Sequence, residues 1–133
     1  MTFIAPEKHA KGIAAQIGTR QAFLVALDQG RDAGLATCDR LCGGVGHSRT
    51  MEHAIRLARG MSGRAFDHML MAAVEDRMRA GGAHSMFAGA SAQNPAGCPF
   101  HVRLGYTETA ALPAVGWTFG RWTDPVLVQK FLA

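Results

Sequence analysis

A strand, a helix and a second strand follow one another in the middle of this chain, and this order constrains the fold most strongly. Residues 50–58 alternate apolar and polar side chains with a period of two, which predicts a strand. Residues 65–80 carry an apolar helical face that stops at Gly81 and Gly82, and residues 85–90 have the pattern of a buried strand. Strand, helix and strand in this order predict a parallel crossover within one sheet.

The flanking segments predict further strands and one more helix. Apolar or alternating runs predict strands over residues 23–27, 33–38, 106–111 and 124–131. Asn94 and Pro95 suit the first positions of a helix that ends at Gly105, and the first twenty residues predict a short helix. The pattern therefore predicts a single α/β (α+β) domain over residues 1–133, with a mixed central β-sheet and flanking helices.

Composition narrows the class of protein. The 133 residues are 48% hydrophobic and 18% charged, which suits one globular core. The net charge of +4 suits an anionic ligand, but the basic residues form no run, so we expect no nucleic-acid partner. The sequence shows no membrane-spanning stretch and no signal-peptide core, so we expect no membrane partner and a cytoplasmic protein. Cys38, Cys42 and Cys98 give neither a disulfide framework nor a zinc pattern, so we expect no metal.

Two groups of short motifs carry a resemblance to a known family. The first group is Met71 to Asp76, Asn94-Pro95 and Leu104-Gly105-Tyr106. The second group is Leu112 to Gly116, Phe119 to Trp122 and Asp124. They resemble the helix-strand-helix unit and the terminal hairpin of the phosphinothricin acetyltransferase branch of the Gcn5-related N-acetyltransferase (GNAT) superfamily. The resemblance runs from Phe23 to Lys130 and implies the GNAT (acyl-CoA N-acyltransferase) fold, abbreviated at its N-terminus.

The resemblance implies an enzyme that transfers acetyl from acetyl-CoA to the primary amine of a small molecule, such as an amino acid or a phosphinothricin-like compound. The alternative is a degenerate, non-catalytic GNAT-like protein that binds CoA or acts through dimer contacts. A shortened N-terminal region would leave an apolar edge of the sheet exposed, and a second subunit could cover that edge. We therefore expect a homodimer. Trp117, Phe119 and Trp122 are expected to pack in the core or at the dimer interface rather than against the cofactor, and the alternative is that they close over a small substrate.

Two residues are catalytic candidates through the resemblance. Thr50-Met51-Glu52-His53 is similar to a family strand segment with a Glu-His pair, which implies that Glu52 is the general base, acting through water. The alternative is a surface glutamate, and His53 is expected to face the core with the apolar residues of this strand. His101 matches the position of a general-acid tyrosine in the wider family and would protonate the leaving thiolate. The alternative there is an exposed helical histidine.

The acetyl-CoA contacts are assigned through the same resemblance. The strand at Ile55 and Leu57 would pair with the pantetheine arm through its backbone. Asn94 would contact the CoA arm near the sulfur, or would simply cap the following helix. The loop assigned to the pyrophosphate contains Ser62, Gly63, Arg64, Ala65, Asp67 and His68.

This loop departs from the family pattern, which is Gln or Arg, two residues, Gly, one residue, then Gly or Ala. The three defined positions fall on Ser62, Ala65 and Asp67, so none carries its usual residue. A shifted register on Gly60, Gly63 and Ala65 restores two small residues but moves against the following helix. Asp67 in the first helical turn would compete with phosphate for the free N–H groups. We therefore expect weakened CoA affinity.

Overall fold

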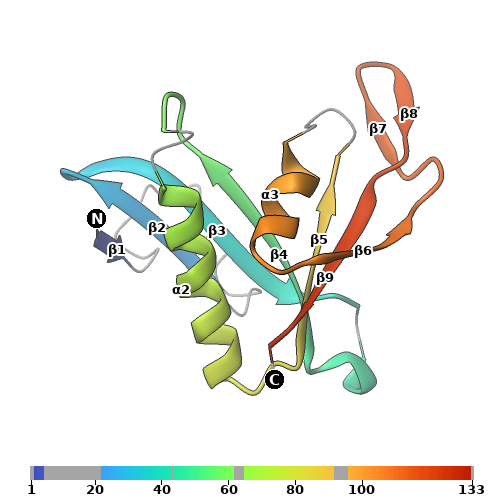
Figure 1. Ribbon diagram of the computed structural model, residues 1–133, viewed down its shortest axis with the longest axis horizontal. Coiled ribbons are helices and arrows are strands. Elements are labelled where there is room, and N and C mark those ends of the chain that lie inside the picture. The colour runs from blue at the N-terminus through green and yellow to red at the C-terminus, as the bar shows by residue number, and fades with distance from the viewer. Residues whose placement is uncertain (1, 5–21, 43, 62–64, 92–95, 133) are drawn as a thin grey trace.

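A seven-stranded mixed sheet forms the body of the protein (Figure 1). The computed structural model describes residues 2–4, 22–42, 44–61, 65–91 and 96–132. The strands, in their order across the sheet, are β1 (Thr2–Ile4), β2 (Ala22–Asp28), β3 (Arg31–Arg40), β4 (Thr50–Leu57), β5 (Ser85–Ala90), β9 (Val126–Phe131) and β6 (Thr107–Ala111). Neighbouring strands are antiparallel except for β4 and β5, which are parallel.

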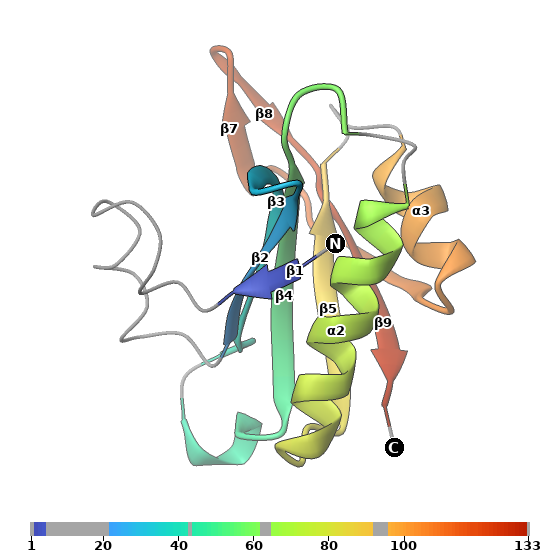
Figure 2. The same ribbon diagram turned by 90° about the vertical axis from the view of Figure 1, so that its left-hand side faces the viewer.

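The two helices, α2 (Phe66–Ala80) and α3 (Gly97–Arg103), lie on the same face of the sheet (Figure 2). α2 connects β4 to β5, as the strand-helix-strand pattern predicts for a parallel crossover. It packs over β2, β3 and β4, whereas α3 packs over β6 and β9. None of the described helices is long and apolar enough to cross a membrane.

The core lies between α2 and the sheet. Leu70, Met71 and Val74 are fully buried on the sheet-facing side of α2, opposite small residues of the strands. Gly34 on β3 explains how closely the helix approaches, since a Cβ there would lie 2.8 Å from the Arg56 carbonyl oxygen and 3.2 Å from Leu70 Cδ1. Burial of these side chains supplies the main driving force for docking α2 on the sheet.

A buried polar network ties α2 to the C-terminal part of the sheet. Glu75 of α2 accepts a hydrogen bond of 3.1 Å from the Tyr106 hydroxyl and one of 2.8 Å from Lys130 Nζ. Burial and the neighbouring carboxylate raise the pKa of Tyr106. Both carboxylate oxygens are therefore paired, as a buried charge requires.

The structure confirms most of the elements predicted from sequence and corrects two. Residues 2–4 form a strand that pairs with β2, where a helix was expected; the rest of that expected helix lies outside the described residues. The segment expected to connect residues 111 and 124 contains a hairpin of β7 (Gly116–Thr118) and β8 (Arg121–Thr123). A short 3₁₀ turn, Val45–His47, precedes β4. The helix predicted to begin at Asn94 begins at Gly97 in the described residues.

Candidate active site

The parallel strands β4 and β5 separate halfway along their length. Their pairing begins at Thr50 and Ser85 and ends at Glu52 and Phe87, although β4 continues to Leu57 and β5 to Ala90. Figure 1 shows the two strands diverging toward the end of the molecule that holds α3. The edges that face each other in this gap carry backbone groups that β4 and β5 do not satisfy for one another.

Two pockets occupy this region and meet inside it. The first, which we call the α2 pocket, has a volume of about 730 Å³ and is lined by Ile55, Leu57, Ala58, Arg59, Gly60, Ala65, Asp67, His68, Ala96, Gly97, Phe100 and Arg103. The second, the hairpin pocket, has a volume of about 700 Å³ and is lined by His53, Ala54, Ile55, Arg56, Ala88, Gly89, Ala90, Ser91, Gly97, Phe100, His101, Thr118 and Phe119. Ile55, Gly97 and Phe100 line both, so the two pockets adjoin at the gap between the strands.

The N-terminus of α2 borders the α2 pocket and already carries an acid. Ala65 precedes the helix with φ 65° and ψ 6°, a left-handed conformation that glycine adopts more easily than alanine. The Asp67 carboxylate accepts a hydrogen bond of 2.8 Å from the His68 backbone N–H. One of the free donors of the helix is therefore occupied by the protein itself. Arg59 and Arg103 line the same pocket and leave it net positive.

A pair of buried histidines lies at the base of the hairpin pocket. His53 of β4 and His101 of α3 are 3% and 6% exposed, and their Nε2 atoms lie 2.9 Å apart. His101 Nδ1 lies 2.8 Å from the Gly97 carbonyl oxygen, which can only accept, so this nitrogen carries a proton. With neutral rings, His53 Nε2–H donates to His101 Nε2. Burial, and secondarily His101, lower the pKa of His53 to about 3.

His53 Nδ1 is buried and has no hydrogen-bond partner among the described residues. In the neutral pair it is an acceptor, since the ring proton of His53 sits on Nε2. The structure confirms that His53 faces the core, and the alternative of an exposed His101 is wrong because α3 packs that side chain against His53 and Tyr106.

Glu52 lies on the opposite face of β4 from His53, as strand alternation predicts. Its side chain is exposed and lines neither pocket, and its cross-strand neighbour on β3 is Asp39. Ala54 and Arg56 share that face and line the hairpin pocket. Glu52 therefore lies on the strand face that leads to the pocket, next to a second acid.

Most of the remaining predicted residues gather around the same gap. Ile55, Leu57, Ala65, Asp67 and His68 line the α2 pocket, and His101 lines the hairpin pocket. Ser62, Gly63, Arg64 and Asn94 lie outside the described residues. Sequence analysis missed the three arginines Arg56, Arg59 and Arg103 and the shared wall at Phe100. The strand alternation that places Glu52 could have found Arg56, since both lie on the polar side of the same pattern.

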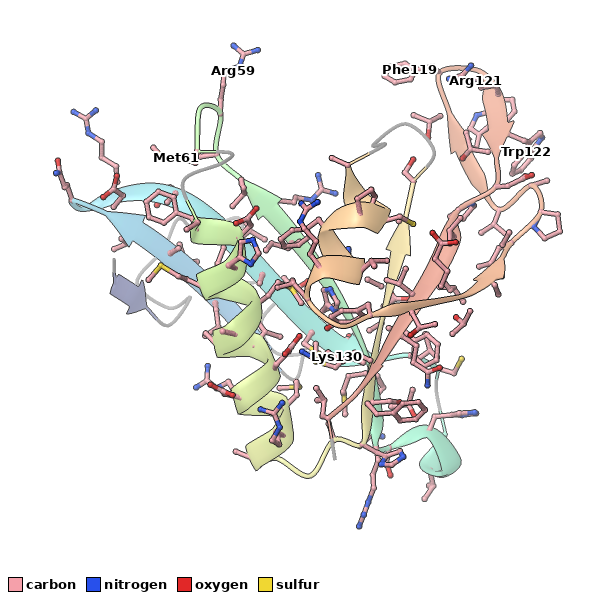
Figure 3. All side chains as sticks on the ribbon, viewed as in Figure 1. Arg59, Met61, Phe119, Arg121, Trp122 and Lys130 are labelled. Carbon is pink, nitrogen blue, oxygen red and sulfur yellow. The ribbon has the colours of Figure 1, made fainter. Side chains whose placement is uncertain are left out.

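The aromatic residues of the β7–β8 hairpin are exposed, so they do not pack in the core, and their packing at a dimer interface stays a prediction. Trp117 and Trp122 pair across the hairpin with ring centroids 4.9 Å apart, and both remain more than half exposed. Phe119 lies at the hairpin tip (Figure 3) and lines the hairpin pocket while 91% exposed. Phe119 and Gly120 both have positive φ, 52° and 73°, which is the pattern of a type I′ turn.

Comparison with known proteins shows which proteins this chain is similar to. No protein-family model matches the chain. Over 84 residues it is 37% identical to an L-methionine sulfoximine/L-methionine sulfone acetyltransferase of Salmonella typhimurium, covering 63% of this chain and 49% of that protein. The structure of yncA from Salmonella typhimurium with its cofactor acetyl-CoA has a TM-score of 0.83 and 29% identity, covering 98% of this chain and 75% of that one. A GNAT superfamily phosphinothricin acetyltransferase from Sinorhizobium meliloti, in complex with acetyl-CoA, has a TM-score of 0.83 at 24% identity, covering 90% and 68%.

The mixed sheet with its two splayed parallel strands is the acyl-CoA N-acyltransferase fold of the GNAT superfamily. Its sequence is similar to methionine sulfoximine and phosphinothricin N-acetyltransferases. The chain spans about half the length of the curated relatives that it matches.

The residues of the α2 pocket suit the extended arm of acetyl-CoA better than they suit its phosphate groups. Ile55, Leu57 and Phe100 provide an apolar wall for an extended arm, and Arg59 and Arg103 suit phosphate groups. Asp67 is the one described feature that opposes an anionic group there, because its carboxylate already occupies the His68 N–H.

Proposed function

We propose that this protein is an N-acetyltransferase that moves the acetyl group of acetyl-CoA to the primary amine of a small molecule, such as an amino acid or a phosphinothricin-like compound. Acetyl-CoA supplies an activated thioester. In the reaction the amine nitrogen bonds to the acetyl carbon, the carbon–sulfur bond breaks, and the proton lost by the amine balances the one gained by the thiol.

The observation that carries the proposal is the gap between β4 and β5 where the two pockets adjoin. A long thiol-bearing arm in the α2 pocket and an amine in the hairpin pocket would meet beside Ile55, Gly97 and Phe100. Such placement of two reactants in adjoining pockets lowers the entropic part of the barrier. The relative from Salmonella typhimurium is named for acetyl transfer to amino-acid analogues, which favours an enzyme over the non-catalytic alternative.

We assign two proton-transfer roles within this proposal. Glu52 accepts the amine proton through water, because its exposed side chain lies on the face of β4 that continues into the hairpin pocket. His101 lines that pocket and delivers a proton to the thiolate. Its Nε2 accepts from His53 in the neutral pair and must first take up a proton, since Nδ1–H stays bound to the Gly97 carbonyl.

We also propose that the protein is a cytoplasmic homodimer. Val115, Trp117 and Trp122 form an exposed apolar group on one small hairpin, which suits burial against a second subunit. Cys38, Cys42 and Cys98 are free thiols, which suits a reducing compartment. Light scattering that shows a stable monomer at micromolar concentration would contradict the dimer.

Two measurements test the enzyme. Thermal unfolding with acetyl-CoA reports binding, since ligand at about 100 times its dissociation constant adds about 2.7 kcal/mol of stability. Release of free thiol from acetyl-CoA with a panel of small amines then reports turnover. Stabilisation without thiol release for any amine would support the non-catalytic alternative, and the absence of both would refute the proposal.

The assigned roles are tested by Glu52→Gln and His101→Gln. Each is expected to lower kcat by about 10²-fold or more while acetyl-CoA still stabilises the protein. Glu108→Gln, at an exposed glutamate of β6 that lines neither pocket, is the matched control. Full activity in Glu52→Gln would remove Glu52 as the base.

A further inference from the structure

We propose that Arg56 determines which amines this protein accepts, by binding an anionic group that the acceptor carries beside its amine. The proposal rests on the proposed acetyl transfer and assigns a specificity residue to its acceptor side. Arg56 is not one of the two catalytic candidates, and it does not line the α2 pocket.

Arg56 is placed by the alternation of β4. Its side chain shares the exposed strand face with Glu52 and Ala54, whereas Met51 and His53 face the core. The residue lies beyond Glu52, where β4 no longer pairs with β5, and it lines the hairpin pocket together with Ala90, the last residue of β5, and Ser91. Arg56 is therefore held on β4 beside the gap between the two strands.

The charge of Arg56 stands out in its surroundings. Apart from its two histidines, the described lining of the hairpin pocket carries a formal charge only at Arg56, and small or apolar side chains make up most of the rest. Within the described part of the chain Arg56 has no ion pair, and its cross-strand neighbour on β3 is Leu35. A single cation beside low-dielectric walls attracts an anion more strongly than one in open water.

The charges along this strand face are arranged in two groups. Glu52 of β4 and Asp39 of β3 are directly opposite one another at one end of the face. Arg56 follows four residues later, on the order of 13 Å along the strand. An acceptor that carries both an ammonium group and a carboxylate could place its nitrogen near Glu52 and Asp39 and its carboxylate near Arg56. Arginine is the side chain best suited to a carboxylate or phosphinate, because its planar fork donates two parallel hydrogen bonds.

The test compares an amino acid with its uncharged amide in four proteins. The probes are L-methionine sulfone and L-methionine sulfone amide, and the proteins are the wild type, Arg56→Gln, Arg56→Lys and Arg77→Gln. Arg77 is exposed on α2 and lines neither pocket, so it is the matched control. Thiol release gives kcat/KM for each probe, and thermal unfolding with each amine alone gives a readout that needs no turnover. The two amines differ in basicity, so the quantity compared between proteins is the ratio of kcat/KM for the acid to kcat/KM for the amide.

We expect the wild type to favour the acid over the amide and Arg56→Gln to reduce that ratio by about tenfold, mainly through KM. Arg56→Lys should keep part of the preference, and Arg77→Gln should keep all of it. A ratio unchanged in Arg56→Gln, or a wild type that uses the amide as well as the acid, would overturn the inference while leaving acetyl transfer intact. A wild type that neither binds acetyl-CoA nor releases thiol would overturn both.

Discussion

The Nε2 atoms of His53 and His101 lie 2.9 Å apart in a buried contact between β4 and α3. His101 is locked by the Gly97 carbonyl, so one tautomer of the neutral pair satisfies the contact. Among the described residues, no acid hydrogen-bonds to His53 to stabilise the charge that an added proton would bring. A charged His53 would also be repelled by His101 if that ring were protonated too. The pair therefore links the integrity of the cleft to pH.

Acidification should destabilise the protein through His53. The folded pKa of about 3 lies below the ordinary value of 6.5, so the unfolded chain binds a proton first as the pH falls. The free energy of unfolding is therefore lost below about pH 6.5 and should drop by about 2 kcal/mol by pH 5 from this residue alone. Urea unfolding at pH 7.5 and pH 5 measures the loss.

The matched variants for this measurement are His53→Gln and His84→Gln. His53→Gln should reduce the dependence on pH, because the group that takes up the proton on unfolding is gone. His84 is exposed on the loop before β5, so its replacement should leave the dependence as in the wild type. Equal pH dependence in the wild type and His53→Gln would contradict the assignment.

Ala65→Gly should stabilise the protein. Ala65 holds φ 65°, where a side chain costs about 1–2 kcal/mol, and glycine loses part of that gain to its greater unfolded freedom. The expected net increase in the free energy of unfolding is up to about 1 kcal/mol, measured by urea unfolding. Ala72→Gly, at an exposed position inside α2, should instead lower it by about 1 kcal/mol. Equal losses in the two variants would show that the left-handed backbone at Ala65 carries no strain.

Removing the charge of Asp67 should strengthen acetyl-CoA binding while weakening the free protein slightly. Asp67→Asn keeps an acceptor for the His68 N–H but no longer repels a phosphate, and Asp67→Gly also frees that donor. Both should increase affinity for acetyl-CoA by at least about twofold, as measured by calorimetric titration. Asp76→Asn, further along α2, is the control. If neither Asp67 variant gains affinity, the carboxylate does not oppose the cofactor.

The sequence predicted the crossover well because the information was local. The alternation of β4 and the Gly81-Gly82 stop of α2 are short-range patterns, and the structure reproduces both nearly to the residue. The same alternation correctly placed Glu52 and His53 on opposite faces. Likewise, placing Asp67 in the first turn of α2 required only that the start of the helix be located.

The cleft itself depended on features that no local pattern reports. The contact between His53 and His101 joins residues 48 positions apart and exists only because α3 packs on the same face of the sheet that His53 faces. The point at which β4 and β5 stop pairing depends on the twist of the whole sheet rather than on the residues Glu52 and Phe87 themselves. The two strands of the aromatic hairpin gave no strand pattern because each is only three residues long, although the family resemblance indicated a hairpin in this region.

Phe119→Asn should separate function from stability at the hairpin tip. A type I′ turn requires positive φ at both central residues, and asparagine tolerates this far better than phenylalanine. The Phe119 ring is 91% exposed, so its removal forfeits almost no burial in the free protein. The variant should therefore unfold with unchanged or slightly higher free energy, by up to about 1 kcal/mol.

The same substitution removes an apolar wall from the hairpin pocket, so KM for an apolar amine acceptor should rise while acetyl-CoA still stabilises the protein. Trp122→Ala gives the opposite pattern, because it breaks the 4.9 Å pair with Trp117 but does not line the pocket. That variant should lose about 0.5–1.5 kcal/mol of stability, with little change in KM for the amine acceptor. Loss of stability in Phe119→Asn would mean that the ring holds the hairpin together, and an unchanged KM would remove it from the acceptor site. Unchanged stability together with a raised KM would assign the strained backbone of Phe119 to a contact between its ring and the bound acceptor.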